Sequence, residues 1–256
     1  MSDSVRVCAV IPVYNHAHLV GDTLRALRAQ GIDCVLVNDG GDEQATQTLR
    51  ALASETDSDL VEQFPNGGKG RAVLLGMHHG LGRGYTHALQ IDADGQHEVS
   101  DARGLIQLAE QHSEAVITGI PRYDESVPRH RYYSRYLTHV WVWIETLSFE
   151  IKDSMCGFRV YPLAPVMQLA RDVSLGGRMD FDTEVLVRLH WRGVRVVSVP
   201  TRVVYPANGV SNFRLWGDNV VISWMHTKLV LGMLIRLPVI IGRRLTRLRE
   251  SRRGRE

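Results

Sequence analysis

The chain has 256 residues, of which 44% are hydrophobic, and its 30 lysines and arginines nearly balance 28 aspartates and glutamates. This composition excludes a disordered or collagen-like chain and suits one large domain or at most two. The three cysteines form no Cys-x-x-Cys pair, which argues against a disulfide framework and against a cysteine zinc site. We therefore expect a globular protein of a reducing compartment, by default the cytosol.

Five apolar runs rich in Val, Ile and Leu follow one another at 5–11, 34–37, 60–64, 87–91 and 115–118. Successive runs begin 29, 26, 27 and 28 residues apart, which leaves room for a strand, a helix and two loops each time. Leucines recur at helical spacing between several runs, at Leu19, Leu24 and Leu27, at Leu49 and Leu52, and at Leu105 and Leu108. Strands that alternate with helices predict an α/β fold with a mostly parallel central sheet and helices on both faces.

Unusual residues follow four of these runs, at the points where the strands should end. The four segments are Pro12–His16, Asn38–Gly41, Asn66–Gly70 and Asp92–His97. Each segment alone could be an ordinary turn. In sheets of this kind ligands bind at the carboxyl ends of the strands, so the presence of all four at one edge favours a binding site.

The pattern Asp-x-Asp occurs three times, at 57–59, 92–94 and 180–182, so the pattern alone identifies nothing. Position distinguishes Asp92 and Asp94, because they directly follow a predicted strand. Together with the amide oxygen of Gln96 they offer hard oxygen ligands at alternating positions, which suit Mg²⁺ or Mn²⁺. We therefore favour a metal site here over a solvated turn.

The glycine-rich segment at 66–71 is not a Walker phosphate loop, because its Gly-Lys pair is followed by Gly70 and Arg71 and not by Ser or Thr. ATP hydrolysis is therefore not indicated. A Gly-Gly-Lys-Gly turn at the start of a helix could still present backbone N–H groups and the ammonium of Lys69 to a diphosphate.

In their order along the chain, these motifs resemble those of family 2 glycosyltransferases of the GT-A fold, in the branch of the dolichyl- and polyprenyl-phosphate glycosyltransferases. The resemblance runs from about Val7 to Phe213. The matching pieces are Ile11–Asn15, Val37–Gly40, Asn66–Gly70, Asp92–His97, Cys156–Arg159, Phe181–Glu184, Gly193, Val199–Pro200 and Gly209–Ser211. Ordered agreement of this many pieces is specific for the family and much less specific for the substrates.

The resemblance implies a nucleoside-diphosphate sugar donor and a divalent ion that bridges its diphosphate to the carboxylates of Asp92 and Asp94, with Gln96 as a further ligand. The residues implied to hold the nucleotide sugar are Pro12, Tyr14, Asn15, Asp39, Gly68, Lys69, Asp92 and Ala93. Cations are expected to stabilise the charge that develops on the departing diphosphate. The candidates are Lys69, Arg122 and Arg159, the last of which could instead be structural.

The chain departs from the family pattern where donor and acceptor contacts are expected. His16 stands where an acidic residue commonly follows Tyr-Asn, and Asn38 replaces the first of two aspartates. Pro206 stands where an Arg is common in relatives that use phosphate acceptors. The acceptor therefore stays open between a lipid-linked or polyprenyl phosphate and a hydroxyl of a glycolipid.

Activation of the acceptor depends on that choice. A hydroxyl acceptor requires a general base, for which Asp182 at a predicted helix entry is the candidate. A phosphate acceptor is already ionised and needs no strong base. A purely structural alternative is that Asp182 and Glu184 are first-turn residues favoured by the helix dipole.

The near-neutral total charge hides an uneven distribution. From Arg236 to Glu256 there are 8 arginines and 2 glutamates, a net charge of +6, so residues 1–235 carry 22 basic and 26 acidic residues, a net charge of −4. We predict a GT-A domain over 1–219 and an amphipathic, Arg-rich tail over 220–256 that lies on the anionic cytoplasmic face of the cell membrane. Because His226, Lys228 and Arg236 interrupt the apolar stretch, a spanning helix is not expected.

Two other classes of protein fit less well. Nucleic-acid binding is disfavoured because the arginine cluster lies beyond the predicted domain and shows no recognition motif with interleaved aromatic residues. A sugar nucleotidyltransferase would share the sheet, the metal carboxylates and a glycine-rich loop. In that class, however, the glycine-rich loop typically follows the first strand, whereas here Pro12–Asn15 follows it.

Overall fold

The computed structural model describes residues 4–15, 17–122, 129–203 and 215–253, so His16 and Pro206 lie outside it. Its centre is one seven-stranded sheet with the strand order β3-β2-β1-β4-β6-β5-β7. The strands are β1 (Val7–Val13), β2 (Asp33–Asp39), β3 (Asp59–Gln63), β4 (His87–Gln90), β5 (Ala115–Arg122), β6 (Arg159–Pro162) and β7 (Arg195–Arg202). Neighbouring strands are parallel except at β6, which runs antiparallel to β4 and β5.

The predicted mostly parallel sheet is confirmed, and the five apolar runs correspond to β1–β5. In β1, the residues Cys8, Ala9, Val10 and Ile11 are all fully buried. Burial on both faces explains why the run is continuously apolar and does not alternate. The five apolar runs did not include β6 or β7. β6 has only four residues, and it begins with Arg159 and ends with Pro162, so no apolar run marks it.

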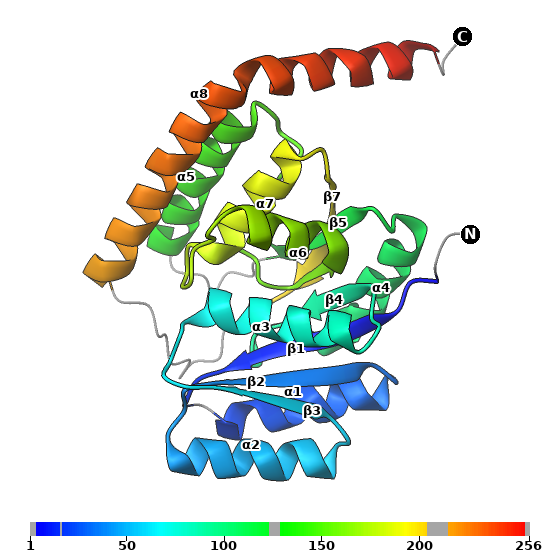
Figure 1. Ribbon diagram of the computed structural model, residues 1–256, viewed down its shortest axis with the longest axis vertical. Coiled ribbons are helices and arrows are strands. Elements are labelled where there is room, and N and C mark those ends of the chain that lie inside the picture. Colours follow the sequence, from blue (N-terminus) through cyan, green and yellow to red (C-terminus); the bar gives the residue numbers. More distant parts are fainter. Residues whose placement is uncertain (1–3, 16, 123–128, 204–214, 254–256) are drawn as a thin grey trace.

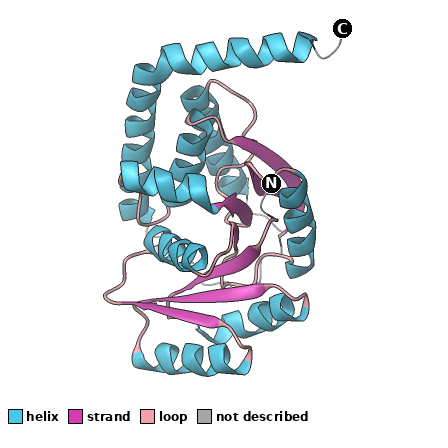
Figure 2. Ribbon diagram, turned by 45° about the vertical axis from the view of Figure 1, so that its right-hand side comes forward, coloured by secondary structure: helices cyan, strands magenta, loops and turns pink. Residues whose placement is uncertain are grey.

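Helices cover both faces of the sheet (Figures 1 and 2). On one face lie α1 (Ala17–Ala29), α2 (Glu43–Glu55) and α4 (Ala102–Gln111), the last preceded by a 3-10 turn at Val99–Asp101. The other face is covered by α3 (Lys69–Gly82), α6 (Leu163–Asp172) and α7 (Phe181–Trp191), with α5 (Arg129–Thr146) and α8 (Leu215–Arg253) packed outside them. The surface helix α1 buries one apolar stripe with Val20, Leu24 and Leu27, whereas α7 is buried over most of its length.

The C-terminal helix α8 is 39 residues long and contains Pro238. It packs against α5 and α7, then bends in its second half, and its last turns extend away from the body (Figures 1 and 2). Proline removes a backbone hydrogen bond from a helix interior, which accounts for a bend there. The helix begins at Leu215, five residues before the predicted start of the tail. By length and composition alone, Trp216–Arg243 is apolar enough to cross a membrane.

Candidate active site

The carboxyl ends of β1, β2, β3 and β4 lie at one edge of the sheet, where the strand order changes direction at β1. β1 pairs with β2 on one side and with β4 on the other. Such a switch point leaves a crevice outside the strand ends, where ligands of open α/β sheets bind. The four segments singled out in the sequence follow these four strands, and the structure therefore brings them to one edge.

The ammonium of Lys69 lies at the centre of this edge. Lys69 is the first residue of α3, and its Nζ lies 2.8 Å and 2.9 Å from the two carboxylate oxygens of Asp92. The same Nζ lies 2.8 Å from Oδ2 of Asp182, in the first turn of α7. One cation thus joins the loop after β3, the loop after β4 and the start of α7.

This cation is held firmly in its charged form. Burial alone would lower the pKa of Lys69, but the carboxylates of Asp182 and Asp92 outweigh burial and raise the pKa above its ordinary value. The pKa of Asp182 is affected in the opposite sense. Burial would raise it, but Lys69 and then Arg159 hold it below its ordinary range.

Asp182 is almost fully enclosed by its own partners. The residue is 5% exposed, and its Oδ1 accepts a hydrogen bond of 2.8 Å from Nε2 of Gln90, which is fully buried at the end of β4. Its other carboxylate oxygen contacts Lys69. A carboxylate with both oxygens engaged and a lowered pKa is a poor proton acceptor, which weighs against Asp182 as a general base.

The three residues expected to hold a metal ion follow β4 as predicted. Asp94, Gln96 and Asp92 are all half-buried, and Oδ1 of Asp94 accepts a hydrogen bond from the backbone N–H of Gln96 at 3.1 Å. Burial raises the pKa of Asp94, and the negative charge of Asp92 raises it further. Two carboxylates that repel each other in a partly buried loop suit a divalent cation.

Within the described part of the chain, no three His, Cys, Asp or Glu side chains converge on one metal position. The donor set expected from the sequence is two carboxylates and an amide oxygen. Such a set leaves coordination positions for water and for a ligand that brings its own oxygens, as a diphosphate does.

Asp39, at the end of β2, organises the glycine-rich loop. Its carboxylate accepts four hydrogen bonds: from the backbone N–H groups of Gly67 at 2.7 Å and Gly68 at 2.9 Å, and from the side chains of Gln63 at 2.9 Å and Asn66 at 3.0 Å. The residue is 3% exposed. The role that the resemblance implies for Asp39 is contact with the nucleotide. In the structure its acceptor positions are occupied by the protein itself.

The same loop differs from the expected phosphate cradle in its backbone direction. Gly68 precedes α3 with a φ of +91°, and its N–H and that of Gly67 turn inward to Asp39. The N–H of Gly70 donates to the carbonyl of Gly177 at 3.0 Å. These three groups stabilise the loop, and the side chain of Lys69 is the part of it that reaches the centre of the site.

The remaining residues expected to hold the donor line the ends of β1 and β4. Tyr14 is 41% exposed, so its ring is accessible, and Pro12 and Ala93 are half-buried. Asn15 has a positive φ of 55°, and its Oδ1 accepts a hydrogen bond from the backbone N–H of Asp42 at 3.0 Å. Asn15 thereby joins the loops that follow β1 and β2.

The two candidate arginines are not brought to the centre of the site. Arg159 is fully buried, and its guanidinium donates to Oγ1 of Thr118 at 3.0 Å, to the hydroxyl of Tyr161 at 3.0 Å and to the carbonyl of Asp182 at 2.6 Å. Arg159 therefore connects β5, β6 and α7, which favours the structural role considered for it above over a catalytic one. Arg122 is exposed at the end of β5, with β6 between that strand and β4.

Gly157 is a site residue that sequence reasoning did not single out, although it lies in a matching motif. A Cβ atom at this position would lie 2.9 Å from Oδ2 of Asp92 and 2.9 Å from Nζ of Lys69. Any side chain here would therefore press on the central ion pair. The loop that carries it is held by Asp153, which accepts hydrogen bonds from the N–H groups of Met155 and Cys156.

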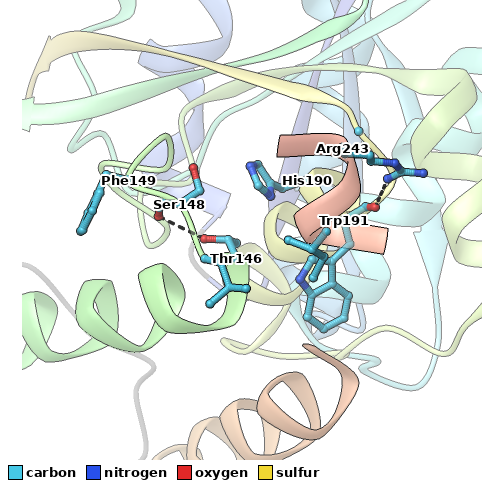
Figure 3. Close-up of a pocket in the computed structure, with 9 residues that line it drawn as sticks. Thr146, Ser148, Phe149, His190, Trp191 and Arg243 are labelled. Atoms are coloured by element: carbon cyan, nitrogen blue, oxygen red, sulfur yellow. Dashed lines mark hydrogen bonds between the residues drawn. The ribbon is translucent and has the colours of Figure 1, made fainter. Parts of the chain in front are cut away.

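A separate cavity of about 130 Å³ lies at the other end of α7 (Figure 3). Its lining includes Ser148, His190, Trp191 and Arg243, and Arg243 donates a hydrogen bond to the carbonyl of Trp191. On α7, His190 follows Asp182 by eight residues, so about 12 Å of helix separates this cavity from Asp182. It is not part of the strand-end site.

The fold and the motifs have counterparts in known proteins. The chain is 27% identical over 205 residues to glycosyltransferase AglJ of Haloferax volcanii, an alignment that covers 78% of this chain and 63% of that protein. It is 26% identical over 207 residues to undecaprenyl-phosphate mannosyltransferase of Micrococcus luteus, which covers 78% of this chain and 84% of that protein. The chain thus spans less than two thirds of the length of AglJ.

Solved structures show the same GT-A fold. Glucosyl-3-phosphoglycerate synthase of Mycobacterium tuberculosis, in complex with Mn²⁺, uridine diphosphate and glucosyl-3-phosphoglycerate, matches with a TM-score of 0.59 at 12% identity, covering 90% of this chain and 79% of that one. The sequence family described as Glycosyl transferase family 2 matches residues 8–175, which is more than half of the chain. The chain therefore belongs to glycosyl transferase family 2.

Proposed function

We propose that this glycosyltransferase moves a sugar, with inversion, from a nucleoside-diphosphate sugar to a polyprenyl phosphate at the cytoplasmic face of the membrane. The observation that carries the choice of acceptor is the state of Asp182, which is buried, bonded through both carboxylate oxygens and held below its ordinary pKa. A hydroxyl acceptor would need this residue as a base. A phosphate oxygen attacks the anomeric carbon without one.

Departure of the nucleoside diphosphate is the step that the site serves. Negative charge develops on the diphosphate as the bond from the anomeric carbon breaks, and a preorganised cation lowers the barrier for this step. Lys69 is such a cation, because two carboxylates fix its position and keep it protonated. Asp92, Asp94 and Gln96 would hold a Mg²⁺ or Mn²⁺ ion, which supplies further charge stabilisation at the diphosphate.

Binding of the nucleotide is assigned to the ends of β1 and β2. The exposed ring of Tyr14 offers a stacking surface beside Pro12, and Asn15 fixes the loop that carries them against the loop after β2. Asp39 contributes by holding Gly67 and Gly68, so that Lys69 enters the site from a fixed start of α3. The mannosyltransferase of Micrococcus luteus supports the acceptor, since its name specifies undecaprenyl phosphate.

The proposal is tested by incubating the purified chain with Mn²⁺, a panel of radiolabelled nucleotide sugars and one of two acceptors, undecaprenyl phosphate or undecaprenol. Label in an acid-labile lipid product formed only with undecaprenyl phosphate is the expected result. Asp94→Ala serves as the control, since it removes one proposed metal ligand. Transfer to the free hydroxyl alone would refute the phosphate acceptor and restore a base role for Asp182.

A further inference from the structure

The outward face of α8 is apolar where a helix in water would be charged. Seven large apolar side chains on it are at least half exposed. They are Trp216 (84%), Val220 (66%), Trp224 (61%), Leu231 (55%), Leu234 (54%), Ile235 (80%) and Val239 (54%). Several are spaced by four residues and therefore share one side of the helix. We call these seven residues the outer face. An exposed apolar strip of this length indicates a surface that binds a membrane or another protein.

Three polar residues in the first half of the same helix, Asp218, His226 and Lys228, contact the body of the protein. Asp218 is 3% exposed, and its Oδ1 lies 3.6 Å from Nε of Arg178 in the loop before α7. Lys228 lies 3.7 Å from Glu184, and Nδ1 of His226 lies 2.7 Å from Oε1 of Glu145 on α5. A surface helix of a soluble protein has the reverse polarity, with its charges outward.

These inward contacts decide how α8 can meet a bilayer. The stretch is long and apolar enough to span one, but spanning would pull Asp218, His226 and Lys228 away from their partners. Glu145 is fully buried and would then be left as an unpaired carboxylate, which is costly, whereas Glu184 would keep its ion pair with Arg188. The geometry therefore favours a helix that lies along the membrane surface and stays attached to the protein.

Charge selects the kind of surface. Beyond Ile235 the chain carries eight arginines and two glutamates, so this end is attracted to anionic headgroups. Trp216 and Trp224 on α8 are amphipathic rings of the type that settle at the interface between headgroups and acyl chains. The apolar surface continues on α5, where Leu137 and Trp141 are exposed and the ring of Trp141 lies beside His226.

We propose that the outer face of α8, extended by α5, docks the protein onto an anionic lipid bilayer, with α8 lying in the membrane surface and its charged side turned to the protein. In Figure 1 the first turn of α8 lies on the same side of the molecule as the carboxyl ends of β1–β3. Docking in this way brings the strand-end site close to the headgroups. The proposal depends on no assignment of donor or acceptor.

Flotation with lipid vesicles tests the proposal on the full chain without any substrate. Trp224→Ser combined with Ile235→Ser should lower vesicle binding at least ~10-fold, because two large apolar groups lose their burial in lipid. Leu19→Ser is the matched control, since Leu19 is 38% exposed on α1, on the opposite face of the sheet, and it should bind as the wild type does. All variants should keep the wild-type melting temperature, because the altered side chains point outward.

Vesicle composition separates the two contributions to binding. Vesicles of phosphatidylcholine mixed with phosphatidylglycerol should bind the chain more tightly than phosphatidylcholine alone. Replacing Arg247, Arg249 and Arg252, three of the eight arginines, by Gln should reduce that difference. Asp94→Ala should float like the wild type, so failure of the transferase proposal would leave this result intact.

Three outcomes would overturn the inference. The first is wild-type flotation by the Trp224→Ser and Ile235→Ser double variant. The second is a wild-type chain that binds no vesicles but forms a dimer which the double variant loses, since the outer face would then be covered by a second copy. The third is resistance of bound protein to extraction at alkaline pH, which would show that α8 spans the bilayer.

Discussion

Replacing Lys69 by Met would leave Asp182 buried without its cation. Removing one partner of a buried ion pair typically costs about 3–5 kcal/mol. We take the lower end, about 3 kcal/mol, because the Asp92 side chain is 27% exposed and can be solvated, whereas that of Asp182 is only 7% exposed. For a chain of this length that free energy corresponds to a fall in melting temperature of roughly 6–12 °C.

The pH dependence gives the sharper test. In the wild type the pKa of Asp182 is lowered, so its contribution to stability is present above the ordinary carboxyl pKa and is lost as pH falls through the folded-state value. In Lys69→Met, burial acts against a weaker set of cations and the pKa of Asp182 rises. The stability deficit of the variant should therefore be largest near neutral pH and should shrink as the pH falls toward about 4.

Equilibrium urea denaturation without nucleotide or metal measures this deficit at a series of pH values. In a chain that already carries Asp182→Asn, the Lys69→Met change should cost at least ~1 kcal/mol less than in the wild type, because the charge it would strand is gone. A deficit that is independent of pH and fully additive with Asp182→Asn would refute the electrostatic role of this pair.

Three further predictions concern the strand-end site. Asp94→Ala should abolish the Mn²⁺-dependent rise in melting temperature on addition of nucleoside diphosphate, with no loss of stability in the free protein; thermal shift assays with and without the ion measure both. Asp39→Ala should destabilise the chain by about 2 kcal/mol, since two backbone N–H groups lose a buried acceptor, and should raise the KM for donor; an unchanged KM would contradict its role in holding the loop. Gly70→Ala places a Cβ 2.5 Å from the carbonyl oxygen of Gly176 and should lower the free energy of unfolding by about 1–3 kcal/mol. Gly82→Ala is the control, since its Cβ would meet nothing within 4 Å and should cost no more than a few tenths of a kcal/mol. Equal melting temperatures of the two variants would contradict the packing argument.

The sequence predicts the parallel half of the sheet well because its strands are buried on both faces and are therefore continuous apolar runs. β6 escapes prediction because its four residues include Arg159, whose buried charge is tolerated only through partners on β5, β6 and α7. These partners come from distant parts of the chain, so no local sequence pattern predicts that a buried arginine is tolerated there. Position after a strand was enough to single out Asp92 and Lys69 individually.

The contacts between those residues could not be predicted. Lys69 and Asp182 are far apart in the sequence, and they meet because α3 and α7 pack together, with Gly70 and Gly177 in backbone contact. The role of Asp39 could not be predicted either, because the sequence does not distinguish an aspartate that binds a loop from one that binds a ligand. Gly157 matters only through the side chain that it lacks.

The inward charges of α8 also bear on how the enzyme can be handled in solution. A chain shortened before this helix would strip the cover from apolar side chains that now pack against Met225, Leu229 and Met233, and would leave Glu145 without His226. Such a fragment should aggregate. A more water-soluble form is better obtained by keeping the helix and replacing the exposed apolar residues by polar ones. These residues lie on the side of α8 that does not pack against the rest of the protein.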